Sequence, residues 1–167
     1  VLVSYNKLVK QRNMTENQKS QIDIQLQRRF DLIPNLVEVV KGYASHEKST
    51  LEAVVQARNN YDSAGRDTQS ALAADGELNQ ALSRLFVIVE AYPELLANKS
   101  FLNLQNELSE TEKKIAFSRQ FYNDSVTKLN NLIDMFPSSI VASLFGFKKE
   151  RYFETTDSQR QNVSIDL

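Results

Sequence analysis

Hydrophobic residues in the C-terminal half of the chain recur at steps of three, four or seven, which places them on one face of an α-helix. This stripe predicts a single long helix over roughly residues 99–135. Pro137 ends the predicted helix, because proline lacks an amide donor and clashes with the preceding turn. The stripe consists of Phe101, Leu104, Leu108, Ile115, Tyr122, Val126, Leu129, Ile133 and Phe136.

A second stripe predicts a helix over roughly residues 32–62. Asp31 just before it and Pro34 in its first turn indicate a helix start, where the missing N–H of proline costs little. The same phase extends back through Ile22, Leu26 and Phe30, so a continuous, kinked helix remains an alternative to a turn near residue 31. The stripe consists of Ile33, Val37, Val40, Ala44, Leu51, Val54 and Arg58.

A third stripe runs from Leu78 to Leu96 and is broken by Pro93. Between it and the second stripe, residues 63–67 and Asp75-Gly76 predict a loop, because they combine glycine with short polar residues. A fourth apolar segment opens the chain with Leu2, Tyr5, Leu8 and Val9, and the chain is then polar over residues 10–21.

Four such stripes predict an all-α fold, an up-and-down four-helix bundle of long helices. Only four Gly and three Pro occur among the 167 residues, which leaves few turns for a many-stranded protein. We expect one domain over 1–154, closed by a short helix after Pro137 that caps the open end of the bundle, and a mobile polar tail over 155–167. A docking patch for lipid or a partner is the alternative for the apolar residues of that segment, Ile140, Val141, Leu144, Phe145 and Phe147.

The formal charge of −1 conceals a basic N-terminal end. Residues 1–30 hold six Lys and Arg against two Asp and Glu. These cations are too scattered for a nucleic-acid footprint, so no nucleic-acid partner is expected. The longest apolar run, residues 85–89, is far short of the roughly 20 residues that span a bilayer. Val1-Leu2-Val3 is either the end of a hydrophobic segment or simply the start of a helix.

Few residues are suited to catalysis. The absence of Cys excludes thiolate zinc sites and a cysteine nucleophile, and the isolated glycines form no phosphate-binding loop. His46-Glu47 resembles the opening of a zinc-protease motif, but the second histidine is replaced by Thr50. We therefore expect no metal, cofactor or catalytic set.

His46 permits one sharper hypothesis, a histidine phosphotransfer or signalling domain in which the imidazole accepts a phosphoryl group. Ser49 occupies the position where that class of domain usually has a basic residue. A structural histidine, hydrogen-bonded to a neighbouring carboxylate, is the favoured interpretation.

The densest polar cluster places Arg28 and Arg29 between Asp23 and Asp31. It predicts either a charge network that fixes the joint between helices or a site for an acidic partner. The structural interpretation is favoured, because opposite charges at this density usually satisfy one another.

Taken in order, motifs along almost the whole chain resemble the LemA family. One departure is Gln18-Lys19, where family members often have Ala-Trp. The first half of the resemblance lies in Tyr5-Asn6-Lys7-Leu8-Val9, Arg12-Asn13, Ile22-Asp23, Arg28-Arg29, Asp31-Leu32-Ile33-Pro34-Asn35-Leu36-Val37, Val40-Lys41-Gly42-Tyr43-Ala44, His46-Glu47 and Ala57-Arg58. The second half lies in Glu90-Ala91-Tyr92-Pro93-Glu94-Leu95, Glu112, Ile115-Ala116, Arg119, Tyr122-Asn123, Phe136-Pro137 and Tyr152-Phe153-Glu154.

The resemblance implies a bundle of long helices preceded by a single N-terminal membrane helix, and it implies no particular biochemical activity. It favours the interpretation of Val1-Leu2-Val3 as the end of a membrane anchor. Basic residues beside such an anchor favour a cytoplasmic position for the bundle by the positive-inside tendency. We therefore predict a membrane-anchored, non-enzymatic interaction or scaffold module with an unidentified protein partner. Its candidate interaction residues are Lys7, Lys10, Arg12, Lys19, Arg28, Arg29, His46 and Glu47.

Overall fold

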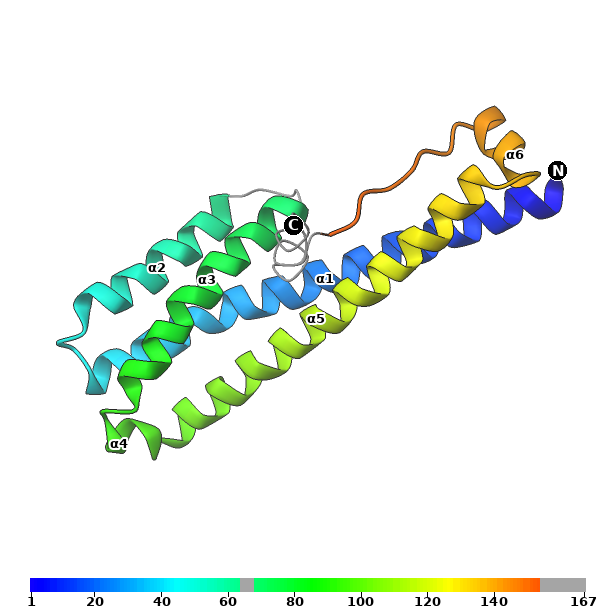
Figure 1. The fold of residues 1–167 in the computed structure, drawn as a ribbon. Helices are drawn as coiled ribbons and strands as arrows, with labels where there is room; N and C mark the ends of the chain where they lie inside the picture. The colour runs from blue at the N-terminus through cyan, green and yellow to red at the C-terminus, as the bar shows by residue number, and fades with distance from the viewer. Residues whose placement is uncertain (64–67, 154–167) are drawn as a thin grey trace, which may run out of the picture. The chain divides into compact units, whose positions relative to one another are not determined.

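The computed structural model describes residues 1–63 and 68–153, and within them every regular element is a helix (Figure 1). This confirms the predicted all-α class and the bundle of long helices. Of the loop expected over residues 63–67, Ser63 is the last residue of the second helix, and residues 64–67 lie outside the described residues, as does the tail expected over 155–167. The helices are α1 (Leu2–Tyr43), α2 (Lys48–Ser63), α3 (Thr68–Val89), α4 (Pro93–Leu96), α5 (Lys99–Asp134) and α6 (Ser138–Leu144).

The chain forms two compact units, and the long helices α1 and α5 contribute to both. Unit 1 combines residues 1–20 with the chain from Phe117 onward, and unit 2 comprises Gln21–Ala116. No helix in the described ranges is long and apolar enough to cross a bilayer.

The core of unit 2 is built from one face of each of its helices. In this unit the second half of α1, the whole of α2 and α3, the short α4 and the first half of α5 bury their stripes together. Fully buried members include Leu36, Val54, Leu85, Leu95 and Phe101. The predicted stripes are therefore the packing faces of the helices.

Residues 31–34 do not start a helix. The alternative of a turn near residue 31 is therefore wrong, and the alternative of a continuous helix is confirmed. Helix α1 runs through Pro34 without interruption. A proline inside a helix leaves the carbonyl four residues earlier without its amide donor, here the carbonyl of Phe30. Arg58 of α2 supplies a replacement, because its Nε donates to the Phe30 carbonyl oxygen at 3.4 Å. The Arg58 guanidinium also lies 4.0 Å from the centre of the Phe30 ring.

The predicted helix over 32–62 is two helices, and this is a second correction. The chain leaves the α-helix after Tyr43 and enters α2 at Lys48. In the connection, the amide of Glu47 donates to the carbonyl of Ala44 at 3.1 Å. The turn allows Val40 and Val54, which a straight helix would carry far apart, to bury against the same core.

Asp75 and Gly76 do not lie in a loop, which is a third correction. Both residues are inside α3. Asp75 is buried and forms an ion pair with α1, so its side chain serves packing rather than a turn. Pro93 behaves as expected for a helix breaker: α3 ends at Val89, and Pro93 is the first residue of α4.

Unit 1 brings the start of α1 against the end of α5 and the short helix α6. Helix α5 has the predicted extent, and residues after Pro137 fold back as the predicted short helix. Val141 and Ala142 of α6 bury against Leu8 of α1 and Leu129 of α5.

The segment after α6 is fixed along α5 by two asparagines. Asn123 exchanges two hydrogen bonds with the backbone of Phe153, at 2.9 and 3.2 Å. Asn130 does the same with the backbone of Glu150, at 3.0 and 3.1 Å. The two side-chain amides thus pair with an extended chain as a neighbouring strand would.

Candidate functional site

Arg29 is the most deeply buried of the predicted site residues. It lies in α1 on the same helix face as Leu26 and Ile33, so the helix directs its side chain into the core of unit 2. Its exposed fraction is 3%. A charge in such a position is costly to bury unless it is paired and hydrogen-bonded.

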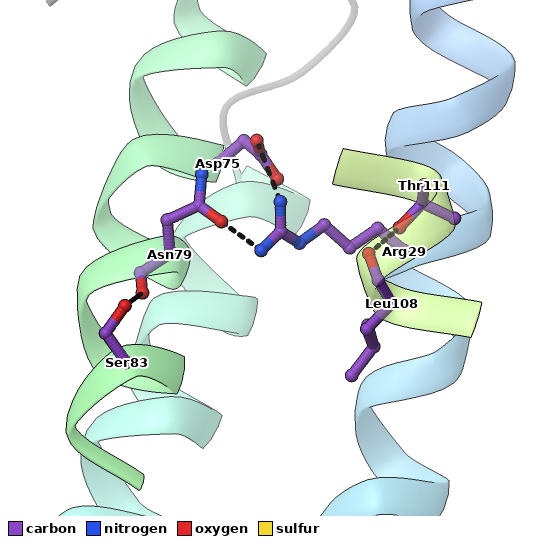
Figure 2. A network of polar contacts seen from close by, with 6 residues as sticks. All are labelled: Arg29, Asp75, Asn79, Ser83, Leu108 and Thr111. Carbon is purple, nitrogen blue, oxygen red and sulfur yellow. Dashed lines mark hydrogen bonds and ion pairs between the residues drawn. The ribbon is translucent and has the colours of Figure 1, made fainter. Parts of the chain in front are cut away.

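The partners of Arg29 lie on α3, across the core (Figure 2). Its Nη1 lies 3.5 Å from a carboxylate oxygen of Asp75. Its Nη2 donates to the side-chain oxygen of Asn79. Among the described residues Nε of Arg29 has no hydrogen-bond partner, so the guanidinium is only partly satisfied. The arrangement joins α1 to α3 through a buried, directional contact.

Two hydroxyl groups near this pair donate hydrogen bonds to backbone carbonyls of their own helices. The Ser83 hydroxyl donates to the backbone carbonyl of Asn79 at 2.9 Å, and the Thr111 hydroxyl donates to the carbonyl of Leu108 at 2.8 Å (Figure 2). Thr111 is fully buried and fills the gap in the α5 stripe between Leu108 and Ile115.

Tyr61 of α2 interacts electrostatically with acidic residues of this region. Burial raises its pKa to about 12, and the negative charges of Asp75, Asp23 and Asp31 add to the shift. Its ring lies 5.1 Å from that of Phe30, the residue whose carbonyl Arg58 satisfies. Contacts from α2 and α3 therefore converge on the stretch of α1 that contains Arg29 and Pro34.

The ion pair that joins Arg29 to another helix lies outside the predicted cluster of Asp23, Arg28, Arg29 and Asp31. Arg28 is half-buried, and Asp31 accepts a hydrogen bond from Gln27 at 3.0 Å. The ion pair that Arg29 makes goes to Asp75 instead.

The basic residues of the N-terminal end lie on the surface of unit 1. Lys7, Lys10 and Lys19 are exposed and form no ion pair with any described residue. Arg12 lies over the ring of Phe147, with its guanidinium carbon 5.0 Å from the ring centre. These cations belong to unit 1, whereas Arg28, Arg29, His46 and Glu47 belong to unit 2.

His46 lies in the turn between α1 and α2, and its side chain is exposed. It makes no hydrogen bond to a described carboxylate, so the expected structural contact is not formed. Glu47 instead accepts a hydrogen bond from the Tyr92 hydroxyl at 3.1 Å, which raises the pKa of Tyr92. Over the described ranges, no three His, Cys, Asp or Glu side chains are grouped to hold a metal ion.

Sequence reasoning missed Asp75, Asn79 and Tyr61. For Asp75 a signal was available, because it lies beside Ala71, Ala74 and Leu78 on the buried face of α3. An acidic residue on an apolar stripe requires a buried partner. Arg29 is the matching cation on the apolar stripe of α1.

The long helices α1 and α5 and the buried pair between α1 and α3 define an all-α helical-bundle protein. Within that class the chain belongs to the LemA family, whose model matches residues 18–167.

Proteins from three organisms are similar to this chain over most of its length. Magnetosome protein MamQ 2 of Paramagnetospirillum magneticum is 27% identical over 92% of this chain and 66% of its own length. Magnetosome protein MamQ of Magnetospirillum gryphiswaldense is 26% identical over 92% of this chain and 65% of its own. Protein LemA of Metamycoplasma hominis is 25% identical over 95% of this chain and 72% of its own. The chain therefore matches about two thirds of the length of the MamQ proteins.

Proposed function

We propose that this chain is the helical module of a membrane-anchored, non-enzymatic protein that binds a protein partner. The observation that carries the proposal is a pair of exposed aromatic residues on α5. Phe117 and Phe121 are 60% and 57% exposed. Four residues apart on a helix, they share one face.

Such a pair is costly to leave in water. Burying a phenylalanine side chain is worth about 1.5–3 kcal/mol, and aromatic residues are enriched in protein interfaces. Both residues belong to unit 1, where the buried Tyr122 and Val126, on a different face of the helix, hold α5 in place. Phe117 and Phe121, called the α5 aromatic face below, are therefore presented on a rigid support.

The non-enzymatic part of the proposal rests on where the reactive groups lie. The Arg29 and Asp75 side chains are only 4% and 6% exposed, so a substrate does not reach them. His46 lies in a turn rather than on the helix face that the phosphotransfer alternative required. This position disfavours the phosphotransfer alternative.

The membrane anchor is proposed from the family resemblance, which implies a membrane helix before residue 1. Lys7, Lys10 and Arg12 form an exposed basic group in the first turns of α1, with no acidic residue before Glu16. By the positive-inside tendency, we place the bundle on the cytoplasmic side.

Proximity labelling and co-purification of the full-length protein in its own host test the proposal. We expect a reproducible partner that is lost in the double variant Phe117→Ser/Phe121→Ser. Val87→Ser is the matched control, because Val87 is 71% exposed on α3 in unit 2. Recovery of the same proteins with all three chains, or of no reproducible partner with the unaltered protein, contradicts the proposal.

A further inference from the structure

Unit 1 has a second exposed apolar surface, at the turn from α5 into α6. Met135, Phe136, Ile140, Leu144 and Phe145, called the apolar tip below, are all more than half exposed. Phe136 is 80% exposed and Leu144 is 73% exposed. Figure 1 shows this turn beside the N-terminal end of α1.

Contacts within unit 1 fix the tip at the start of α1. The hydroxyls of Thr15 and Ser125 are 2.7 Å apart, and Leu8 and Leu129 bury together, so α1 and α5 run antiparallel. Closer to the tip, the ring of Tyr5 lies 4.8 Å from that of Phe145. Because the two helices run antiparallel, the exposed residues Leu2 and Val3 lie toward the same end of unit 1 as the tip.

The tip is anchored rather than loose. Val141 and Ala142 of α6 are buried against α1 and α5, whereas Ile140 and Leu144, four residues apart on the same helix, are exposed. The Phe147 ring packs on Tyr5 at 6.0 Å and lies beneath the Arg12 guanidinium. The exposed apolar side chains are therefore held outward by a packed base.

Cations lie behind the tip. At about 1.5 Å rise per residue, Lys7 lies about 8 Å and Arg12 about 15 Å along α1 from Leu2. Lys148 follows α6 on the segment that Asn130 fixes along α5, and it is exposed. Residues 1–12 and 125–153 together contain seven Lys and Arg against two Asp and Glu. Lys7, Lys10, Arg12 and Lys148 are called the basic collar below.

We propose that the apolar tip inserts into the surface of a membrane bilayer that contains anionic lipids, and that the basic collar binds the lipid headgroups. An apolar end that enters about 5–10 Å into the headgroup region, followed by cations at headgroup level, is the arrangement of interfacial membrane binding. A protein groove would match the tip alone, whereas an anionic bilayer matches both the tip and the collar. This surface is separate from the α5 aromatic face and requires neither the protein partner nor a membrane-spanning helix.

Fluorescence tests insertion directly, because the chain contains no tryptophan. In the 167-residue chain Phe136→Trp introduces one indole at the tip, and Val87→Trp introduces one on the exposed face of α3 in unit 2. With vesicles of phosphatidylcholine and phosphatidylglycerol, we expect a blue shift for the indole at position 136 only. An unshifted emission at position 136, in a chain that retains its helical circular dichroism, overturns the proposal.

Vesicle flotation then separates the apolar and basic contributions. Phe136→Ser/Leu144→Ser is expected to abolish flotation, whereas Phe117→Ser/Phe121→Ser, which removes the α5 aromatic face, is expected to leave it unchanged. The partner capture described above should show the reverse pattern. Failure of the membrane proposal is thereby distinguished from failure of the proposed function.

Removal of three collar charges, by Lys7→Gln/Lys10→Gln/Lys148→Gln, should weaken binding to the anionic vesicles roughly a hundredfold at low salt. The matched control removes three exposed lysines of unit 2, Lys99, Lys113 and Lys114. Equal binding to pure phosphatidylcholine vesicles, or equal loss in both triple variants, overturns the role of the collar. A concentration-dependent dimer that the tip variant abolishes, without any vesicle binding by the unaltered chain, assigns the tip to a second copy and overturns the membrane proposal.

Discussion

The Arg29–Asp75 pair is a buried contact whose removal should have a large effect. In Asp75→Ala, Arg29, which is only 3% exposed in the unaltered chain, keeps its charge but loses the carboxylate 3.5 Å away. Asn79 then offers only a neutral oxygen. Breaking a buried pair from one side typically costs about 3–5 kcal/mol, because the remaining charge is uncompensated. We expect Asp75→Ala to lower the free energy of unfolding by that amount.

Replacement of both partners should behave differently. In Arg29→Met/Asp75→Leu no charge remains buried, and the unpartnered Nε of Arg29 is also removed. Such replacements are often neutral or stabilising by about 1–4 kcal/mol. We therefore expect the double variant to be at least as stable as the unaltered chain. Urea unfolding of the 167-residue chain at neutral pH, followed by circular dichroism, measures both values.

The exposed pair between Lys149 and Asp134 is the matched control. Its atoms are closer, at 2.7 Å, but the side chains are 57% and 55% exposed. Exposed pairs contribute about 0–1 kcal/mol, so Lys149→Ala should change stability by no more than that. The reasoning is refuted if Asp75→Ala costs less than Lys149→Ala, or if the double variant is less stable than Asp75→Ala alone.

Three further predictions rest on the contacts described above. Arg58→Ala should lower the free energy of unfolding by about 1–2 kcal/mol. The loss should be smaller in a Pro34→Ala background, because an alanine at position 34 returns an amide donor to the carbonyl that Arg58 satisfies. A double-mutant cycle in urea measures this coupling, and additive effects would argue against it. Tyr61 has its pKa raised from 10.0 to about 12, so the unfolded chain ionises first and stability should fall as the pH rises from 10 to 12. Tyr61→Phe should show a shallower fall in urea titrations, and equal slopes would contradict the assigned shift. Asn123→Ala should speed hydrogen exchange at the Phe153 amide on the order of tenfold, because the acceptor at 2.9 Å is lost, whereas an unchanged rate would show that this bond does not hold the segment.

The parts of the fold that the sequence predicts are those decided by periodicity within one helix. The extent of α5 and the breaks at Pro93 and Pro137 follow from local steric and hydrophobic rules. Pro34 is misleading in the sequence because its effect depends on a distant residue. Whether a proline interrupts a helix depends on what satisfies the freed carbonyl, and here the donor is Arg58, on another helix. The turn at residues 44–47 contains neither glycine nor proline and is required only by the joint burial of α1 and α2.

The missed site and one of the fold errors have a common cause. Arg29 is a candidate from the sequence, but local reasoning pairs it with its neighbours along the chain. The loop predicted at Asp75-Gly76 removes the true partner from consideration, since a loop residue needs no buried cation. The two residues are informative together: Arg29 and Asp75 are opposite charges on the buried faces of two helices. Because each charge is prohibitively costly alone, their presence on those faces predicts that α1 and α3 pack with these two positions in contact. A charged residue in phase with an apolar stripe is therefore stronger evidence for a helix and its neighbour than an adjacent glycine is for a loop.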